Sequence, residues 1–98
     1  MSSLPPEPVP QSDPLWCYAV LAAPEPDVLP RIVGEFARRG IVPTRLDAVV
    51  AQAALTIDVE VGTLDAQAAA HVAERLRGLP EVERVLVSTR IFAEEARA

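Results

Sequence analysis

Few residues in this chain have the types and spacing that catalysis requires. Cys17 is the only cysteine and His71 the only histidine. Cys17 lies in an apolar segment with no His, Asp or Lys beside it, so it lacks the base that a nucleophile needs. His71 follows three alanines without a neighbouring ligand, which favours a surface side chain over a metal ligand. No acidic pair is spaced for divided acid and base roles. The sequence therefore predicts no catalytic residues, no metal and no cofactor.

One place where residue types do suggest a ligand is the start of the first predicted helix. A helix N-terminus presents free N–H groups and a partial positive charge, which suit a carboxylate. Asp27 stands at the N-cap position and Pro30 lies in the first turn. Two hypotheses remain open. Asp27 can cap the helix with its own side chain and so occupy the anion site itself, or it is an ordinary N-cap and the loop still binds a ligand.

Charge and composition exclude several classes of partner. The chain has a net charge of −5, a pI near 4.7, and nine basic residues, all arginines, which are scattered along the sequence. Such a distribution argues against nucleic-acid binding. No Lys or Arg precedes Arg31, and no apolar run approaches the roughly 20 residues that span a bilayer, which indicates neither signal peptide nor membrane segment. With a single cysteine, a cytoplasmic location is expected.

The chain is long enough for only one small core. It has 98 residues, of which 50% are hydrophobic and 4% aromatic. A domain of this size buries only about 60% of its unfolded surface, so a partner subunit can add much of the missing burial. We therefore expect a homodimer or a higher oligomer.

Hydrophobic patterning predicts strands and helices in the order βαββαβ. Residues 15–22 are apolar on both alternating faces, as in a strand at the centre of a sheet. Residues 55–61 alternate strictly, so one side of the sheet is polar and either wet or against a partly polar interface. The other expected elements are a helix over residues 28–39 that ends at Gly40, a strand over 44–52 joined by a hairpin to the next, a helix over 65–76 that ends at Gly78, and a strand over 81–88.

The two ends of the chain are expected to lie outside this domain. Residues 1–14 hold five of the ten prolines, a composition typical of a disordered tail. A PxxP ligand for a recognition module is the less favoured alternative there. The domain is expected over residues 15–90, and residues 91–98 as a C-terminal tail.

The element order predicts an α+β, ferredoxin-like fold, with a four-stranded antiparallel sheet and two helices on one face. The strands at 15–22 and 55–61 should be central. RNA-binding versions of this fold need exposed aromatic residues where this chain has Thr56, Asp58 and Glu60. Metal-carrying versions need paired cysteines before the first helix, and this chain has none there. The fold alone does not decide the function.

A more specific pattern runs from Val28 to Gly40, V-L-x-R-I-V-G-x-F-x-R-R-G. It resembles an ACT domain, in particular the N-terminal domain of the regulatory small subunit of acetolactate synthase. The resemblance covers residues 15–88. It implies a non-catalytic regulatory protein that confers feedback control by branched-chain amino acids on a separate catalytic subunit.

The resemblance also implies a site. ACT domains pair sheet edge to sheet edge and bind amino acids at the dimer interface. The implied ligand-binding residues are Pro24, Glu25, Pro26, Asp27, Val28 and Leu29 of one chain with Gly40, Ile41, Val42 and Pro43 of its partner. Two residues depart from the family pattern: Pro24 replaces an Asn and Asp27 replaces a Gly. The alternative function is therefore a ligand-free oligomerisation or partner-binding module with a degenerate site.

Overall fold

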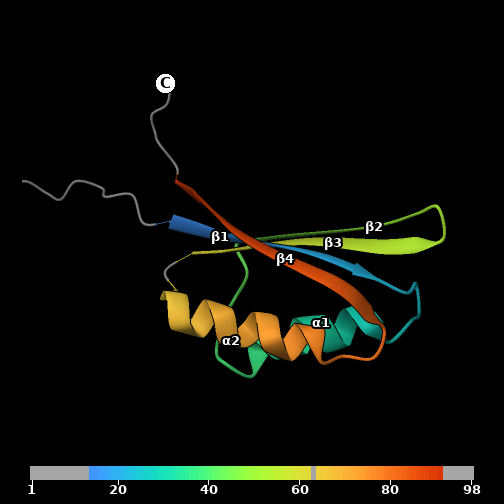
Figure 1. Ribbon diagram of the computed structural model, residues 1–98, viewed down its shortest axis with the longest axis horizontal. Coiled ribbons are helices and arrows are strands. Elements are labelled where there is room, and N and C mark those ends of the chain that lie inside the picture. The colour runs from blue at the N-terminus through green and yellow to red at the C-terminus, as the bar shows by residue number, and fades with distance from the viewer. Residues whose placement is uncertain (1–13, 63, 92–98) are drawn as a thin grey trace, which may run out of the picture.

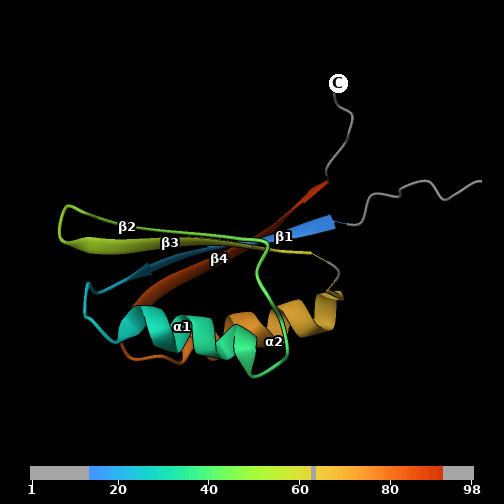
Figure 2. The same ribbon diagram turned by 180° about the vertical axis from the view of Figure 1, so that it is seen from behind.

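The computed structural model describes residues 14–62 and 64–91. These residues form β1 (Pro14–Ala22), α1 (Val28–Ala37), β2 (Arg45–Ala51), β3 (Ala54–Val61), α2 (Ala66–Arg77) and β4 (Val82–Ile91). All strand pairs are antiparallel and the sheet order is β2-β3-β1-β4. Both helices lie on one face of the sheet (Figures 1 and 2). The predicted ferredoxin-like layout, with two central strands at 15–22 and 55–61, is confirmed.

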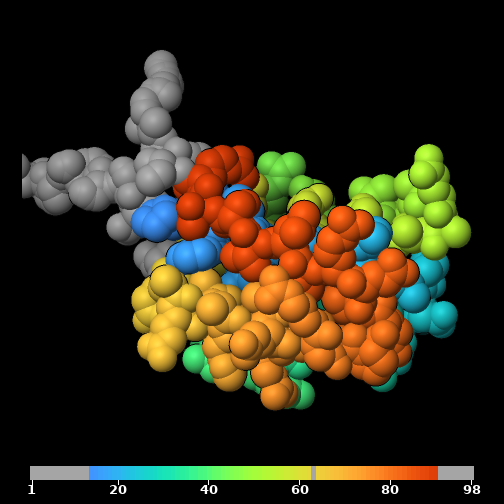
Figure 3. All heavy atoms as spheres, viewed as in Figure 1, coloured from blue at the N-terminus to red at the C-terminus, as the bar shows by residue number. Residues whose placement is uncertain are grey.

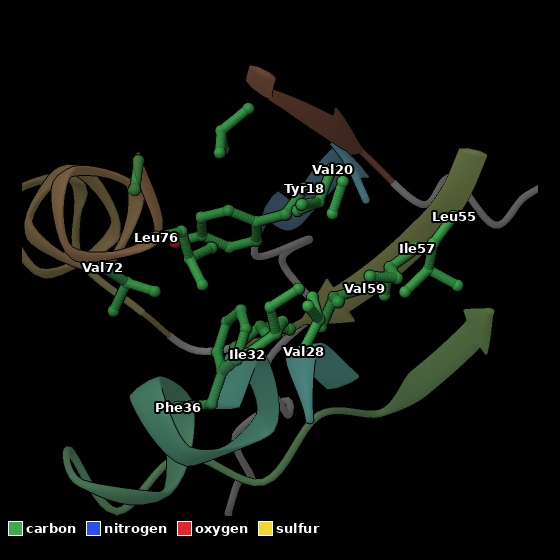
Figure 4. Close-up of a cluster of buried hydrophobic side chains, with 14 residues drawn as sticks. Tyr18, Val20, Val28, Ile32, Phe36, Leu55, Ile57, Val59, Val72 and Leu76 are labelled. Carbon is green, nitrogen blue, oxygen red and sulfur yellow. The ribbon is translucent and has the colours of Figure 1, made fainter. Parts of the chain in front are cut away.

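The core lies between the two helices and the helix-facing side of the sheet (Figure 4). Alternate residues of β1 and β3 point into it, because successive side chains of a strand lie on opposite faces. The helices meet them with apolar residues three or four positions apart, which share one helix face. The largest fully buried side chains are Tyr18, Phe36, Ile32, Ile57, Leu76, Val28, Val59, Val61 and Val72.

Tyr18 is the largest of these side chains and is only 1% exposed. Its hydroxyl donates a hydrogen bond of 2.8 Å to the backbone carbonyl of Ala69 in α2. Its ring meets that of Phe36 in α1 edge to face, with the ring centroids 5.2 Å apart. Tyr18 therefore joins the sheet to both helices. Burial raises its pKa from 10.0 to about 12, because the tyrosinate would lose its hydration in the core.

A buried carboxylate also joins the two helices. Glu35 in α1 is 7% exposed. Its carboxylate lies 3.3 Å from the Arg75 guanidinium in α2 and 3.9 Å from that of Arg38. The charge is thus paired from both helices, which limits the cost of its burial.

Two strand ends differ from the sequence expectation. β4 continues past Ser88 to Ile91, because β1 begins at Pro14 and Pro14 pairs with Ile91. Proline is tolerated as the first residue of a strand. Pro14 and Ile91, which were expected in the tails at residues 1–14 and 91–98, thus belong to the sheet. The remaining tail residues, 1–13 and 92–98, lie outside the described residues.

The predicted hairpin joins β2 to β3 through a turn at Gln52 and Ala53, whose φ angles are 55° and 62°. The hairpin extends beyond the helices and forms a lobe at one end of the molecule (Figures 1 and 3). In β2, Val49 and Val50 are 55% and 63% exposed even though they lie on opposite faces of the strand. Within the described part of the chain, β2 is therefore uncovered on both faces at its hairpin end, whereas Leu46 near its start packs against the core.

The buried tyrosine predicts a specific loss of stability in alkali. Between pH 10 and 12 the unfolded state releases the Tyr18 proton while the folded state keeps it, so the free energy of unfolding falls as pH rises. The full loss for a two-unit difference is about 2.7 kcal/mol. Tyr18 is the only tyrosine, so Tyr18→Phe should abolish this component of the pH dependence. Urea unfolding of the wild type and of Tyr18→Phe between pH 10 and 12 checks this prediction. The same fall in the free energy of unfolding with pH for both proteins would contradict it.

Candidate functional site

The first implied ligand segment is the β1–α1 segment, residues 24–29. Pro24, Glu25, Pro26 and Asp27 are exposed. Val28 is 1% exposed and belongs to the core, while Leu29 is half-buried and packs against it. Only the first four of these residues therefore present side chains that are free to contact a ligand.

This segment is held firmly against the connection between α2 and β4. The backbone N–H of Ala23 donates to the carbonyl of Glu81 at 2.9 Å. The Arg31 guanidinium lies 2.8 Å from the Glu81 carboxylate and 3.2 Å from the Asp27 carboxylate. Arg31 thus ties the start of α1 to a loop fifty residues further along the chain.

The start of α1 differs from the self-capping hypothesis. Asp27 is the N-cap residue, but its side chain makes no capping hydrogen bond and contacts Arg31 instead. The N–H of Val28 donates to the Glu25 carbonyl, and the N–H of Arg31 to the Asp27 carbonyl. Pro30 has no N–H.

Among the hydrogen bonds of the described residues, none comes from the remaining N–H of this turn, that of Leu29. The helix start thus offers one free donor beside the Asp27 carboxylate. This arrangement is a poor site for an isolated anion.

The second implied segment is the α1–β2 segment, residues 40–43. Gly40 has a φ of 71° and donates its N–H to the Ala37 carbonyl at 2.9 Å. Ile41 donates its N–H to the Phe36 carbonyl at 3.0 Å and packs against the core. Val42 is 83% exposed. The helix C-terminus therefore turns sharply at Gly40 and presents Val42 to the outside.

One chain does not bring the two segments together. They lie at opposite ends of α1 (Figure 2). A ten-residue helix is about 15 Å long. The sequence-predicted site is therefore two half-sites on each chain.

The other residues considered for chemistry are separated by the sheet. His71 is exposed on α2 and borders a hollow of about 270 Å³ with Arg39 and Asp65. Cys17 lies on the opposite side of the sheet, with its sulfur 3.4 Å from an Arg90 nitrogen. Within residues 14–62 and 64–91 no group of three or more metal-ligating side chains occurs. In the same residues, no helix is long and apolar enough to cross a membrane.

Sequence reasoning did not identify a hollow on the side of the sheet that faces away from the helices. This surface, the open face, consists of alternate residues of all four strands: Arg45, Asp47, Val49, Thr56, Asp58, Glu60, Leu15, Cys17, Ala19, Leu21, Arg84, Leu86, Ser88 and Arg90. The hollow has a volume of about 750 Å³. The alternation of side chains along each strand indicates which residues lie on this face. Only the strand register shows which of them are neighbours.

Ion pairs line this hollow. Arg90 of β4 pairs with Glu60 of β3 across the intervening strand β1. Asp47 accepts a 2.8 Å hydrogen bond from Arg45, which raises the pKa of Arg45 above its ordinary value.

The element order and the sheet topology place the molecule in the ferredoxin-like class, and comparison with known proteins identifies the family. A family model described as an ACT-like domain matches residues 11–93. The chain belongs to this family, whose domains are typically regulatory modules. Among curated proteins none matches the sequence.

Solved structures agree with the fold. The ACT domain of GTP pyrophosphokinase from Chlorobium tepidum superposes with a TM-score of 0.69 and 12% identity, over 79% of this chain and 100% of that chain. The C-terminal domain of the MgtC protein from Mycobacterium tuberculosis gives 0.68 and 14%, over 89% and 98%. The regulatory subunit of aspartate kinase from Thermus flavus gives 0.60 and 16%. The match covers 79% of this chain and 52% of that subunit, so this chain spans about half of it.

Alanine substitutions at Gly40 and Gly34 should change the stability of the protein in opposite directions. An added Cβ meets nothing within 4 Å at Gly40 or at Gly34, so only backbone preference differs. Gly40→Ala should lower the free energy of unfolding by about 1 kcal/mol, because its φ is left-handed. Gly34→Ala, inside α1, should raise it by about 0.5–1 kcal/mol. Urea unfolding with an unchanged m value checks both, and effects of the same sign would contradict the assignment.

Proposed function

We propose that this protein is a non-catalytic regulatory module that works as a homodimer paired through β2, with an amino acid bound where the two chains meet. The observation that carries the proposal is the uncovered edge of β2. This strand is at the edge of the sheet, and Val50 is 63% exposed on its helix-facing side. An exposed edge with apolar side chains is a template for pairing with another strand.

Edge pairing also explains why the two half-sites lie apart in one chain. Leu55 pairs with Val50 on one side and with Ala22 on the other. The end of β2 is therefore level with the end of β1, where the β1–α1 segment begins. The α1–β2 segment precedes the start of β2. Antiparallel pairing of two β2 strands about a twofold axis perpendicular to the sheet would place each segment near the other chain's complementary one.

The class of ligand and of partner is the finer part of the proposal. The run from Val28 to Gly40 resembles the acetolactate synthase regulatory subunit, which supports branched-chain amino acids as effectors and a separate catalytic subunit as the partner. Val28, Ile32 and Phe36 of this run are core residues. Core residues cannot contact a ligand or a partner. Recognition of a branched-chain amino acid or of that catalytic subunit therefore depends on the exposed loop positions.

A second candidate function is favoured by the start of α1. The Asp27 carboxylate stands beside the single free N–H of Leu29, where it would repel the carboxylate of an amino acid. On this reading the half-sites are degenerate, and the dimer organises a partner protein without a ligand.

Thermal unfolding against a panel of amino acids distinguishes the two functions. A ligand that binds only the folded state raises its stability by about 2.7 kcal/mol at 100 times its Kd. Sensing predicts a selective rise with one class, the branched-chain amino acids being tested first. If no amino acid raises the thermal stability of a protein that stays folded and oligomeric, the result supports the ligand-free module. Asp27→Gly should then gain binding if the carboxylate alone blocks the site.

The edge pairing itself can be tested at Val50. Val50→Lys places a charge on the apolar side of the paired edge and removes apolar contact, so the dimer should dissociate with at least about tenfold higher Kd. Ala70→Lys adds the same charge on α2, where the side chain is exposed, and should leave the Kd unchanged. Sedimentation equilibrium measures both constants. Equal behaviour of the two variants would argue against pairing through β2.

A further inference from the structure

The central strand β1 is apolar on the open face as well as in the core. Its open-face residues are Leu15, Cys17, Ala19 and Leu21. No described segment lies over this side of the sheet, since both helices lie on the other side (Figure 1). Leu86 of β4 pairs with Ala19 and is 58% exposed. An apolar stripe therefore runs along the middle of a solvent-facing sheet.

Charges of opposite sign flank this stripe. Asp58 lies on β3 to one side, and Arg84 lies on β4 to the other. Neither has an ion pair within the described residues, whereas Arg45 pairs with Asp47 and Arg90 with Glu60. Asp47 and Asp58 are directly opposite each other in the β2–β3 register. Like charges in such positions repel, so Asp58 in particular lacks a cation.

Asp58 and Arg84 also border a single hollow above Ala19, with Leu21, Thr56 and Leu86 around it. Its volume is about 380 Å³. The hollow forms because the short side chain of Ala19 stands among longer ones.

We propose that the open face pairs with the open face of a second copy of this chain, about a twofold axis parallel to β1. Such an axis lays β1 on β1, and lays β3 of each copy on β4 of the other. The apolar stripes then cover each other. The acidic flank of each copy meets the basic flank of its partner.

The register brings the unpaired charges within reach of each other. Thr56, Leu21 and Arg84 share one row across the sheet, and Asp58, Ala19 and Leu86 share the next row on that face. Adjacent rows on one face are about 7 Å apart, which an arginine side chain can span. The twofold axis makes two such Arg84–Asp58 pairs in each face-to-face dimer.

The charges also disfavour the other arrangement of two open faces about a twofold axis. An axis that runs across the strands would lay β3 on β3 and β4 on β4. Asp58 would then approach the acidic strand of its partner, and Arg84 the basic one. Opposed like charges in a partly desolvated contact disfavour that arrangement.

The size of the face sets the strength of this contact. Three strands overlap in this arrangement, since β2 of each copy lies beyond β4 of the other. With strands about 4.8 Å apart and seven residues of about 3.3 Å each, the footprint is about 330 Å² per copy. The total of about 660 Å² lies below the range of stable interfaces and fits a weak association. The face is also separate from the β2 edge, so both contacts can form at once. Their twofold axes do not meet, so their combination would extend beyond a closed dimer.

The single cysteine provides a direct test. In the face-to-face dimer, Cys17 of one copy lies opposite Cys17 of the other. In the edge-paired dimer, five strand spacings separate the two thiols, a distance of about 24 Å within one sheet. A short bismaleimide should therefore link two wild-type chains only through the open face. A Cys17→Ser/Ala70→Cys variant, with its thiol on α2, is the matched control and should give no more than collisional linking.

Charge reversal shows whether the linking reports a specific contact. Asp58→Arg and Arg84→Glu should each lower the yield of covalent dimer by about tenfold. The double variant Asp58→Arg/Arg84→Glu re-forms the pair with reversed sign and should restore it, which also rules out misfolding as the cause. A wild-type yield no higher than that of the thiol on α2 would overturn the proposal. So would single reversals without effect.

The failure of this proposal is distinguishable from failure of the edge-paired dimer. Val50→Lys acts on the β2 edge and should not change linking through Cys17. The charge reversals act on the open face and should not change dissociation at the edge.

Discussion

The rest of the structure depends on how little of the sheet two helices can cover. Residues 14–62 and 64–91 form four strands and two short helices, and these helices bury only one side of the sheet. Tyr18 fastens that side to both helices through its ring and its hydroxyl. The β2 edge and the open face remain exposed. A domain with so small a core has much to gain from burying surface against another chain.

The same constraint explains the divided site. The covering helix α1 separates the segments that enter and leave it by about 15 Å, so these segments do not meet in one chain. Arg31 holds the first segment through Asp27 and Glu81, and Gly40 fixes the turn into the second. Each segment is thus held within its own chain, and the proposed site would need a second chain to bring the two segments together.

The periodicity of the sequence was sufficient to predict the fold. Residues 15–22 and 55–61 are the most regularly apolar segments, and they are the central strands because burial selects for that pattern. The ends of the strands were harder to predict, since β4 reaches Ile91 only by pairing with Pro14. The turn type was also unpredictable, because Gln52 and Ala53 adopt left-handed angles that sequence reasoning assigns to Gly or Asn.

The start of α1 was predictable in its cap residue but not in the contacts of that residue's side chain. The position of Asp27 before Val28 indicated an N-cap correctly. It did not reveal that the Asp27 carboxylate contacts Arg31 instead of capping the helix. The conformation of the loop decides between these two contacts. The open face depended even more on tertiary structure. Asp58 and Arg84 are 26 positions apart, and only the strand register places them on either side of one apolar stripe.

The two exposed surfaces differ in the physical forces available to them. The β2 edge offers backbone hydrogen bonds and the apolar side chain of Val50, neither of which depends strongly on ionic strength. The open face offers a weak apolar contact together with two reciprocal charge pairs, which salt screens. Because the Arg45 and Arg90 pairs are already closed within the chain, only Asp58 and Arg84 remain to select a partner. Selectivity at the open face would therefore rest on Asp58 and Arg84 alone, whereas the edge relies on the geometry of the strand itself.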